Sequence, residues 1–285
     1  MRKLKNDRVG LGWRGELCAS ILDRLDSIDV LEVIAEDWTH ASRPEQRALR
    51  SLANERPVIL HGVSLGLASS FAADARRLDR MAKLVETVRP ESWSEHLAFV
   101  RAGGIEIGHL AAPPRNAACI EGTLANLDRA LSIVGSLPAL ENIATLVEPG
   151  ASDLDEAAWT RAIVGPSGAP MLLDLHNLYA NAINFGRDPH ALLMSMPLAN
   201  VQMVHLSGGR WIHPQRGRAR WLDDHLHDVP DPVFDLLESL ASRVAQPLTV
   251  ILERDGNYPA FGEIVAQLER ARLAMARGRR MEEAA

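Results

Sequence analysis

Residues 171–177 read MLLDLHN, an apolar run that ends in Asp174, a side chain able to bind a metal ion. Six other short apolar runs also end in a histidine or a carboxylate: VILHG (58–62), SWSEH (92–96), PALEN (138–142), QMVHLSG (202–208), WLDDH (221–225) and TVILER (249–254). From one metal-capable side chain to the next, the spacing runs from 20 residues (His205 to His225) to 45 residues (His96 to Glu141). Most of these spacings suit one βα unit, since eight such units fill about 250 residues in a barrel. The pattern therefore predicts parallel strands joined by helices.

Strand-like and helix-like stretches alternate along the chain. Strands are predicted at residues 28–36, 57–64, 92–99, 138–144, 169–177, 201–208 and 247–256, with a weakly marked one near ARWLDDH (219–225). The runs are continuously apolar, which is typical of parallel strands buried on both faces. Helices are predicted between them, among them the amphipathic stretch 71–88. We expect an α/β fold, the (β/α)8 TIM barrel.

A single barrel domain over residues 1–285 is expected. The length suits one barrel of about 250 residues or two small domains, and no linker rich in Pro, Gly or Ser divides the chain. The last helix ends in a charged segment, which we expect to fray after about residue 272.

Composition narrows the class of protein. The chain is 47% hydrophobic and 24% charged, as in globular proteins with a sizeable core. A net charge of −6 argues against nucleic-acid binding through a large basic face. No apolar stretch approaches the roughly 18 residues of a membrane span, and MRKLKNDRVG (1–10) lacks the apolar core of a signal peptide. We therefore expect a cytoplasmic protein whose two cysteines, Cys18 and Cys119, are small buried side chains.

The joint placement of the metal-capable residues carries more weight than any one of them. A parallel barrel brings the carboxyl ends of its strands to one rim, so these residues are expected to converge. Burying many ionisable groups is costly unless they are paired or bound to metal, and Arg254 is the only cation directly beside them. The candidates outnumber the ligands of one ion, which predicts two or three ions. Imidazole and carboxylate ligands suit Fe, Mn or Zn, and Glu141, central in strand order, is the natural bridge.

Longer motifs around these positions resemble a known family. They are GLGWR (10–14), LEVIAED (31–37), VILHGVSL (58–65), SEHLAF (94–99), ALENIATL (139–146), LLDLHNLYANA (172–182), VHLSG (204–208), DDHLHDVPDPV (223–233) and LERDGNYP (252–259). The chain resembles the multinuclear non-haem iron-dependent oxidative enzymes, typified by the oxidase of methanobactin biosynthesis, from about residue 8 to 270. The resemblance implies a TIM barrel of the xylose-isomerase type, related to the apurinic-endonuclease barrels.

The resemblance also implies a ligand set for each ion. One metal would be held by His61, His96 and Glu141, a second by Glu141, Asp174, His205 and Glu253, and a third by Asp223, His225 and Asn177. His96, Glu141 and Asp174 are the residues expected to act in catalysis. Asn177 is the weak member, because the related zinc endonucleases place a histidine there and a neutral amide binds metal less well.

Four neighbouring side chains are expected to support the ligands rather than bind metal. Glu36 is expected to hydrogen-bond a ligand imidazole, and Glu95 to point away from the site into a salt bridge. His176 and His227 fit packing beside the ligands better than ligation.

The implied function is an oxidase that uses Fe2+/Fe3+ and O2 to modify a residue, typically cysteine, of a ribosomally synthesised precursor peptide in natural-product biosynthesis. Zn or Mn could substitute for iron. Such enzymes commonly work with a small partner protein that recognises the leader of the precursor. The alternatives are a Zn- or Mn-dependent hydrolase or endonuclease and a sugar isomerase or epimerase on the same barrel. A non-enzymatic metal-storing or peptide-binding barrel is the remaining alternative.

Overall fold

Eight parallel strands form a closed barrel in the computed structural model, which describes residues 6–102, 105–215 and 217–283. The strands are β1 (Arg8–Gly12), β2 (Leu31–Ile34), β3 (Val58–Gly62), β4 (Ser92–His96), β7 (Ala139–Glu141), β8 (Met171–Asp174), β9 (Val201–Leu206) and β12 (Thr249–Leu252). Around the barrel the order is β1-β12-β9-β8-β7-β4-β3-β2, so strands that follow one another in the chain are neighbours. The predicted (β/α)8 barrel is confirmed.

The chain divides into two compact units, which are described separately. Of the described residues, the first unit takes 32–143 (without 103 and 104) and 147–172. The second takes 6–31, 144–146 and 173–283 without 216.

The first unit places three metal-capable residues on neighbouring strand ends. Strand β3 pairs in parallel with β4, with His61 opposite Ser94. Strand β4 pairs in parallel with β7, with His96 opposite Glu141. The strand residues around them are buried on both faces, which explains the continuous apolar runs in the sequence.

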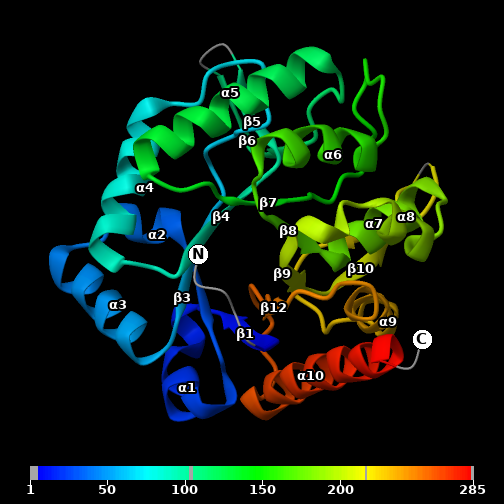
Figure 1. The fold of residues 1–285 in the computed structure, drawn as a ribbon. Helices are drawn as coiled ribbons and strands as arrows, with labels where there is room; N and C mark the ends of the chain where they lie inside the picture. The colour runs from blue at the N-terminus through cyan, green and yellow to red at the C-terminus, as the bar shows by residue number, and fades with distance from the viewer. Residues whose placement is uncertain (1–5, 103–104, 216, 284–285) are drawn as a thin grey trace. The chain divides into compact units, whose positions relative to one another are not determined.

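The helices of the first unit follow one another in Figure 1, and each of the four longer ones contacts the next. They are α2 (Ala35–Thr39), α3 (Arg43–Glu55), α4 (Ala75–Val88), α5 (Ala117–Val134) and α6 (Glu156–Ser167). The four longer helices begin at Ser42, Asp74, Asn116 and Asp155, whose side chains accept hydrogen bonds from first-turn N–H groups. The amphipathic stretch predicted at 71–88 becomes α4, and its apolar positions are buried.

The second unit contains the parallel strands β1, β12 and β9, with β12 between the other two. Its helices are α1 (Cys18–Asp23), α7 (Leu175–Phe185), α8 (Pro189–Ser195), α9 (Asp231–Ala241) and α10 (Phe261–Glu283), with short 3-10 turns at Gly15–Leu17, Leu25–Ser27 and Leu198–Asn200. Helices α9 and α10 pack side by side (Figure 1).

Two expectations about the strands were wrong. The stretch near ARWLDDH is not a barrel strand: β10 (Gly209–Ile212) and β11 (Arg220–Asp223) form an antiparallel hairpin outside the barrel. The missing barrel strand is β1, whose sequence RVGLG carries two glycines and so looks unlike a strand. Gly10 is required there, because a Cβ atom would lie 2.2 Å from the Val30 carbonyl oxygen.

The predicted strand 92–99 is shorter than expected. It ends at His96, and Phe99 begins a separate antiparallel hairpin of β5 (Phe99–Ala102) and β6 (Ile105–Ala111).

The charged segment expected to fray after about residue 272 is helical to Glu283. Arg277 pairs with Glu238 at 2.6 Å and Arg279 with Asp7 at 2.8 Å, so the helix is tied to its own unit by charge. Residues 1–5 of the charged N-terminal segment and the last two residues of the chain lie outside the described part. Within that part, no helix has the length and apolar character needed to cross a membrane.

Candidate metal centre

In the first unit, His61, His96 and Glu141 bring three ligand-type atoms together. The Nε2 atoms of His61 and His96 each lie 3.4 Å from the same Glu141 oxygen, Oε2. All three residues are at most 9% exposed, and their ligand atoms lie within 4.8 Å of one another. A separation of 3.4 Å is longer than a normal hydrogen bond, but it suits three ligands around one ion.

The far nitrogen of each imidazole is held in place by a neighbour. Nδ1 of His96 lies 3.2 Å from the Gly62 carbonyl oxygen, which can only accept, so Nδ1 carries the proton. In the neutral ring, Nε2 then directs its lone pair at a carboxylate, an arrangement that a cation between them would stabilise. Nδ1 of His61 is 2.8 Å from the Ser94 hydroxyl. The donor set and its support therefore fit a metal ion.

Two carboxylates next to this cluster do not behave as predicted. Glu36 accepts a hydrogen bond from the Val63 backbone N–H at 3.1 Å rather than from a ligand imidazole. Glu95 accepts from the backbone N–H groups of Leu65 (3.1 Å) and His96 (3.0 Å), and among the described residues it forms no salt bridge with Lys or Arg. Burial, together with the charge of Glu36, holds the pKa of Glu95 well above its usual range.

Gly62 shows why the Glu95 carboxyl group can sit so close to β3. A Cβ atom at this position would lie 2.7 Å from Oε2 of Glu95 and 3.2 Å from the end of Met81. Only glycine leaves room for the buried acid beside the strand that carries His61.

In the second unit, a denser set of imidazoles and carboxylates surrounds the ends of β9 and β12. Nδ1 of His205 lies 3.1 Å from Oε2 of Glu253. Nε2 of His225 lies 3.0 Å from Oδ1 of Asp223, and its Nδ1 lies 3.6 Å from Glu253 and 3.3 Å from Asp255. These contacts bring together four predicted ligands and one carboxylate, that of Asp255, that was not predicted.

The backbone holds His225 in a conformation that few residues adopt. Its φ is 54°, in the left-handed region. Its N–H donates to the Gly208 carbonyl at 3.0 Å, and its carbonyl accepts from the Asp255 N–H at 2.9 Å. The turn is therefore anchored on both sides and points the imidazole at Asp223, Glu253 and Asp255.

The pKa values of Asp223 and His225 depend on the charged and hydrogen-bonding groups around them. Burial favours the neutral form of Asp223, but hydrogen bonds from His176 and His225 and the charge of His225 outweigh it and hold the pKa of Asp223 well below its usual range. Burial would lower the pKa of His225, but Glu253, Asp223 and Asp255 outweigh it and raise that pKa well above its usual value.

His176 supports Asp223 through both of its ring nitrogens. Nε2 accepts a hydrogen bond from the Trp221 indole N–H at 2.8 Å, so the proton of the neutral ring is on Nδ1, which donates to Asp223 at 2.8 Å. His176 is fully buried. Neither ring nitrogen of His176 therefore has a lone pair free to bind a metal ion. We assign His176 the role of orienting Asp223. His227 hydrogen-bonds Asp224 at 2.9 Å and is half-exposed.

Asp174 and Asn177 lie at the start of α7. The Asp174 side chain caps the helix by accepting from the Asn177 backbone N–H at 2.7 Å, and both side chains are buried. The ligation of a third ion by Asn177 with Asp223 and His225 stays a prediction. So does the shared set of Glu141, Asp174, His205 and Glu253, which draws on residues of both units.

Three supporting residues were missed, although each has a positional signal. Ser94, Trp221 and Asp255 each stand two positions from a predicted ligand, namely His96, Asp223 and Glu253. Side chains two apart in an extended segment lie on the same face. A search of these positions for polar groups would have found them.

The fold and the two clusters define a (β/α)8 barrel with buried imidazole and carboxylate groups of the kind that bind metal ions. The chain belongs to the family of RiPP (ribosomally synthesised and post-translationally modified peptide) precursor modification enzymes MbnB/TglH/ChrH, whose profile matches residues 8–276. The family resemblance inferred from the motifs is thereby confirmed.

The chain is also similar to other proteins over most of its length. A UPF0276 protein of Streptomyces avermitilis is 36% identical over 275 residues, which is 94% of this chain but 55% of the relative's own length. A UPF0276 protein of Bordetella bronchiseptica is 33% identical over 95% of this chain and 93% of its own.

Among solved structures, an L-ribulose 3-epimerase has a TM-score of 0.61 at 13% identity, covering 98% of this chain and 97% of its own. A xylose isomerase domain containing protein of Salmonella typhimurium has a TM-score of 0.62 at 13% identity, covering 97% and 99%. Endonuclease IV from Thermus thermophilus has a TM-score of 0.52 at 14% identity, covering 98% and 100%. At these identities the likeness concerns the fold alone.

Proposed function

We propose that this protein is an iron-dependent oxidase that uses O2 to modify a residue, cysteine in the first instance, of a ribosomally synthesised precursor peptide. Membership of a family of precursor modification enzymes supports the peptide substrate. The observation that carries the metal chemistry is the convergence of His61 and His96 on one oxygen of Glu141, with the far nitrogen of each ring held by a neighbour.

The donor set favours iron, with Mn or Zn as possible substitutes. Both clusters consist of imidazole and carboxylate, which suit these ions. The two cysteines contribute nothing to them: Cys119 is buried in α5, and Cys18 is half-buried at the start of α1. The iron ions, when bound, would supply the reaction with O2 and the oxidation of the substrate.

The protein's own residues would hold and orient the ions. We assign one ion to His61, His96 and Glu141. The ligands of a second are Asp174, His205 and Glu253, and a third, more weakly held ion takes Asp223, His225 and Asn177. Ser94 and the Gly62 carbonyl fix the two imidazoles of the first set, and His176 fixes Asp223.

Metal binding would also displace protons. His225 keeps a proton in the metal-free protein because three carboxylates face it. A ligand imidazole must be deprotonated, so loading this set with metal would release that proton to its surroundings. The proposal includes a small partner protein that recognises the precursor's leader, and it places the reaction in the cytoplasm.

The test uses protein purified without oxygen. We expect two to three irons per chain, absorption typical of a ferric thiolate when a cysteine-containing precursor is added, and O2 consumption that requires that precursor. The matched control is the same peptide with serine in place of cysteine, which should give neither signal. Protein that takes up only zinc under these conditions, with no O2 consumption for any precursor, would contradict the assignment.

A further inference from the structure

A groove runs along α4 in the first unit. It consists of two adjoining hollows, of about 160 Å³ and about 360 Å³, which share Thr39 and Arg80. The smaller hollow is bounded by α2, α4 and the loop after β3, and the larger one by α2, α3 and α4. We call this feature the α4 groove. None of the predicted metal ligands lines it.

Three cations line the larger hollow of the α4 groove. Arg80 and Lys83 extend from α4, and Arg43 lies at the start of α3. Among the residues that the structure describes, none is paired through its side chain by a hydrogen bond or an ion pair to these three cations. On a chain with a net charge of −6, three unpaired cations in one hollow are a local positive feature.

Among the described residues, the acidic groups that line the same groove form no ion pair with its cations. The Glu36 carboxylate is turned to the Val63 backbone N–H, with its two oxygens at 3.1 and 3.2 Å. Glu86 is an exposed residue of the larger hollow. An anionic ligand would therefore meet Arg80 without having to displace a protein carboxylate.

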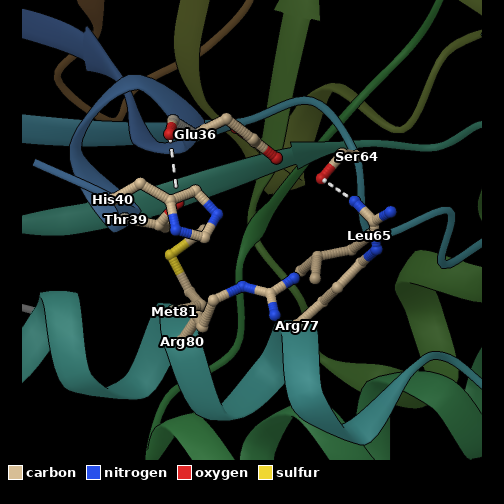
Figure 2. Close-up of a pocket in the computed structure, with 8 residues that line it drawn as sticks. All are labelled: Glu36, Thr39, His40, Ser64, Leu65, Arg77, Arg80 and Met81. Carbon is tan, nitrogen blue, oxygen red and sulfur yellow. Dashed lines mark hydrogen bonds between the residues drawn. The ribbon is translucent and has the colours of Figure 1, made fainter.

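One wall of the groove is held rigidly. In the loop Val63–Leu65, the Val63 N–H donates to the Glu36 carboxylate, and the Leu65 N–H donates to the Glu95 carboxyl group at 3.1 Å. Arg101 donates to the carbonyls of Ser64 and Leu65 at 2.5 and 2.8 Å. Arg77 donates to the Ser64 hydroxyl at 3.1 Å, and Figure 2 shows Arg77 and Arg80 reaching from α4 towards this loop. A preformed wall lowers the entropic cost of binding.

We propose that the α4 groove binds an acidic segment of the precursor peptide, an inference that rests on the proposed peptide-modifying function. Two adjoining hollows suit an extended chain with successive carboxylates better than a single small anion. The loop that forms the wall begins at Val63, directly after the strand that carries His61. A peptide held in the groove would thus be anchored next to a strand end of the candidate metal centre.

The test measures binding of a fluorescein-labelled oligoglutamate peptide to the full chain, without metal and at low salt, by fluorescence anisotropy. The double variant Arg80→Glu/Lys83→Glu should bind about tenfold more weakly, because two charge contacts become repulsive. The matched control is Arg76→Glu/Arg47→Glu, which makes the same change in net charge at exposed positions outside the groove and should bind like the wild type. Circular dichroism checks the fold of each variant.

A second variant keeps the test valid if charge reversal disturbs folding. Arg80→Gln/Lys83→Gln should weaken binding in the same direction, and Arg80→Lys/Lys83→Arg should restore it. Equal weakening in the groove and control variants would overturn the proposal, as would wild-type protein that binds oligoglutamate no better than a neutral peptide. Because no turnover is measured, failure of the oxidase assignment would leave this binding intact, and failure of the groove would leave turnover intact.

Discussion

The two clusters of metal-capable residues differ in what surrounds them. In the first unit, His61, His96 and Glu141 stand on three neighbouring barrel strands, and the two imidazoles are oriented by neutral groups, a hydroxyl and a carbonyl. In the second unit, Asp223 ends the hairpin strand β11 and His225 lies on the turn that follows, and charged groups surround both. We call the first set the rigid cluster and expect it to hold one ion. We call the second set the charged cluster and expect its metal occupancy to depend on the release of a proton from His225.

Replacing Glu141 with Ala should have the largest effect. It removes the oxygen on which two imidazoles converge, and we expect at least about 100-fold weaker iron binding, at or beyond the upper end of losses for supporting residues. Asn177→Ala, which removes a neutral amide, should cost far less. Iron content after anaerobic loading and dialysis, measured by mass spectrometry, checks both variants. Equal losses would contradict a central role for Glu141.

His176→Phe should have the next largest effect, confined to the charged cluster. The ring shape is kept, but Asp223 loses the N–H that orients it and Trp221 loses its acceptor. Removing such a supporting group weakens metal binding by about 10- to 100-fold. The control Trp221→Phe removes the hydrogen bond to His176 but keeps the one from His176 to Asp223, and it should cost less than about tenfold. Titration of metal by calorimetry separates the two, and equal affinities of both variants would remove the orienting role from His176.

Ser94→Ala should cause a smaller loss of metal affinity, confined to the rigid cluster. The His61 imidazole loses the hydroxyl at 2.8 Å but stays packed against His96, whose ring centre is 4.6 Å away. We expect about a tenfold loss of affinity for one ion, and no change at the ions of the second unit. Loss of iron from every site would show that the clusters do not act separately.

The smallest expected effect is a pH dependence of stability in the metal-free protein. The pKa of His225 is raised in the folded state, so its contribution is present in full below about pH 6.5 and is lost as pH rises through the raised pKa. Asp223 has a lowered pKa, so its contribution is present above about pH 4 and is lost in stronger acid.

The variant His225→Asn makes this measurable. Asparagine tolerates the left-handed backbone of this position but does not titrate. Between about pH 6.5 and 9, the wild type should lose roughly 1 kcal/mol more stability than the variant. Thermal unfolding followed by circular dichroism reports the difference, and parallel curves would mean that the imidazole is not charged in the metal-free fold.

The rigid cluster could be predicted from the sequence because its residues follow directly from the barrel pattern. His61, His96 and Glu141 end or nearly end apolar runs of strand length, and parallel pairing brings such ends together. The charged cluster was harder to predict, since Asp223 was assigned to a barrel strand but lies in a hairpin. Strand β1 was missed because Gly10 serves a close backbone approach to Val30 that no propensity reveals.

The hydrogen-bond partners of His176 and Glu36 could not be predicted from the sequence. That His176 uses both ring nitrogens depends on the fold of a hairpin some 45 residues away, which places Trp221 beside it. The predicted partner of Glu36 was wrong because the end of β3 offers a backbone N–H, at Val63, within reach. Such local competition for hydrogen bonds is decided by geometry rather than by residue type.

Counting iron in the double variant His61→Ala/His96→Ala tests most directly whether the two clusters are separate metal sites of one iron enzyme. Wild-type protein loaded without oxygen should carry two to three irons per chain. The double variant should carry one fewer and keep those of the second unit. Wild-type protein that never holds more than one iron, or a correctly folded double variant that loses all of it, would contradict this account.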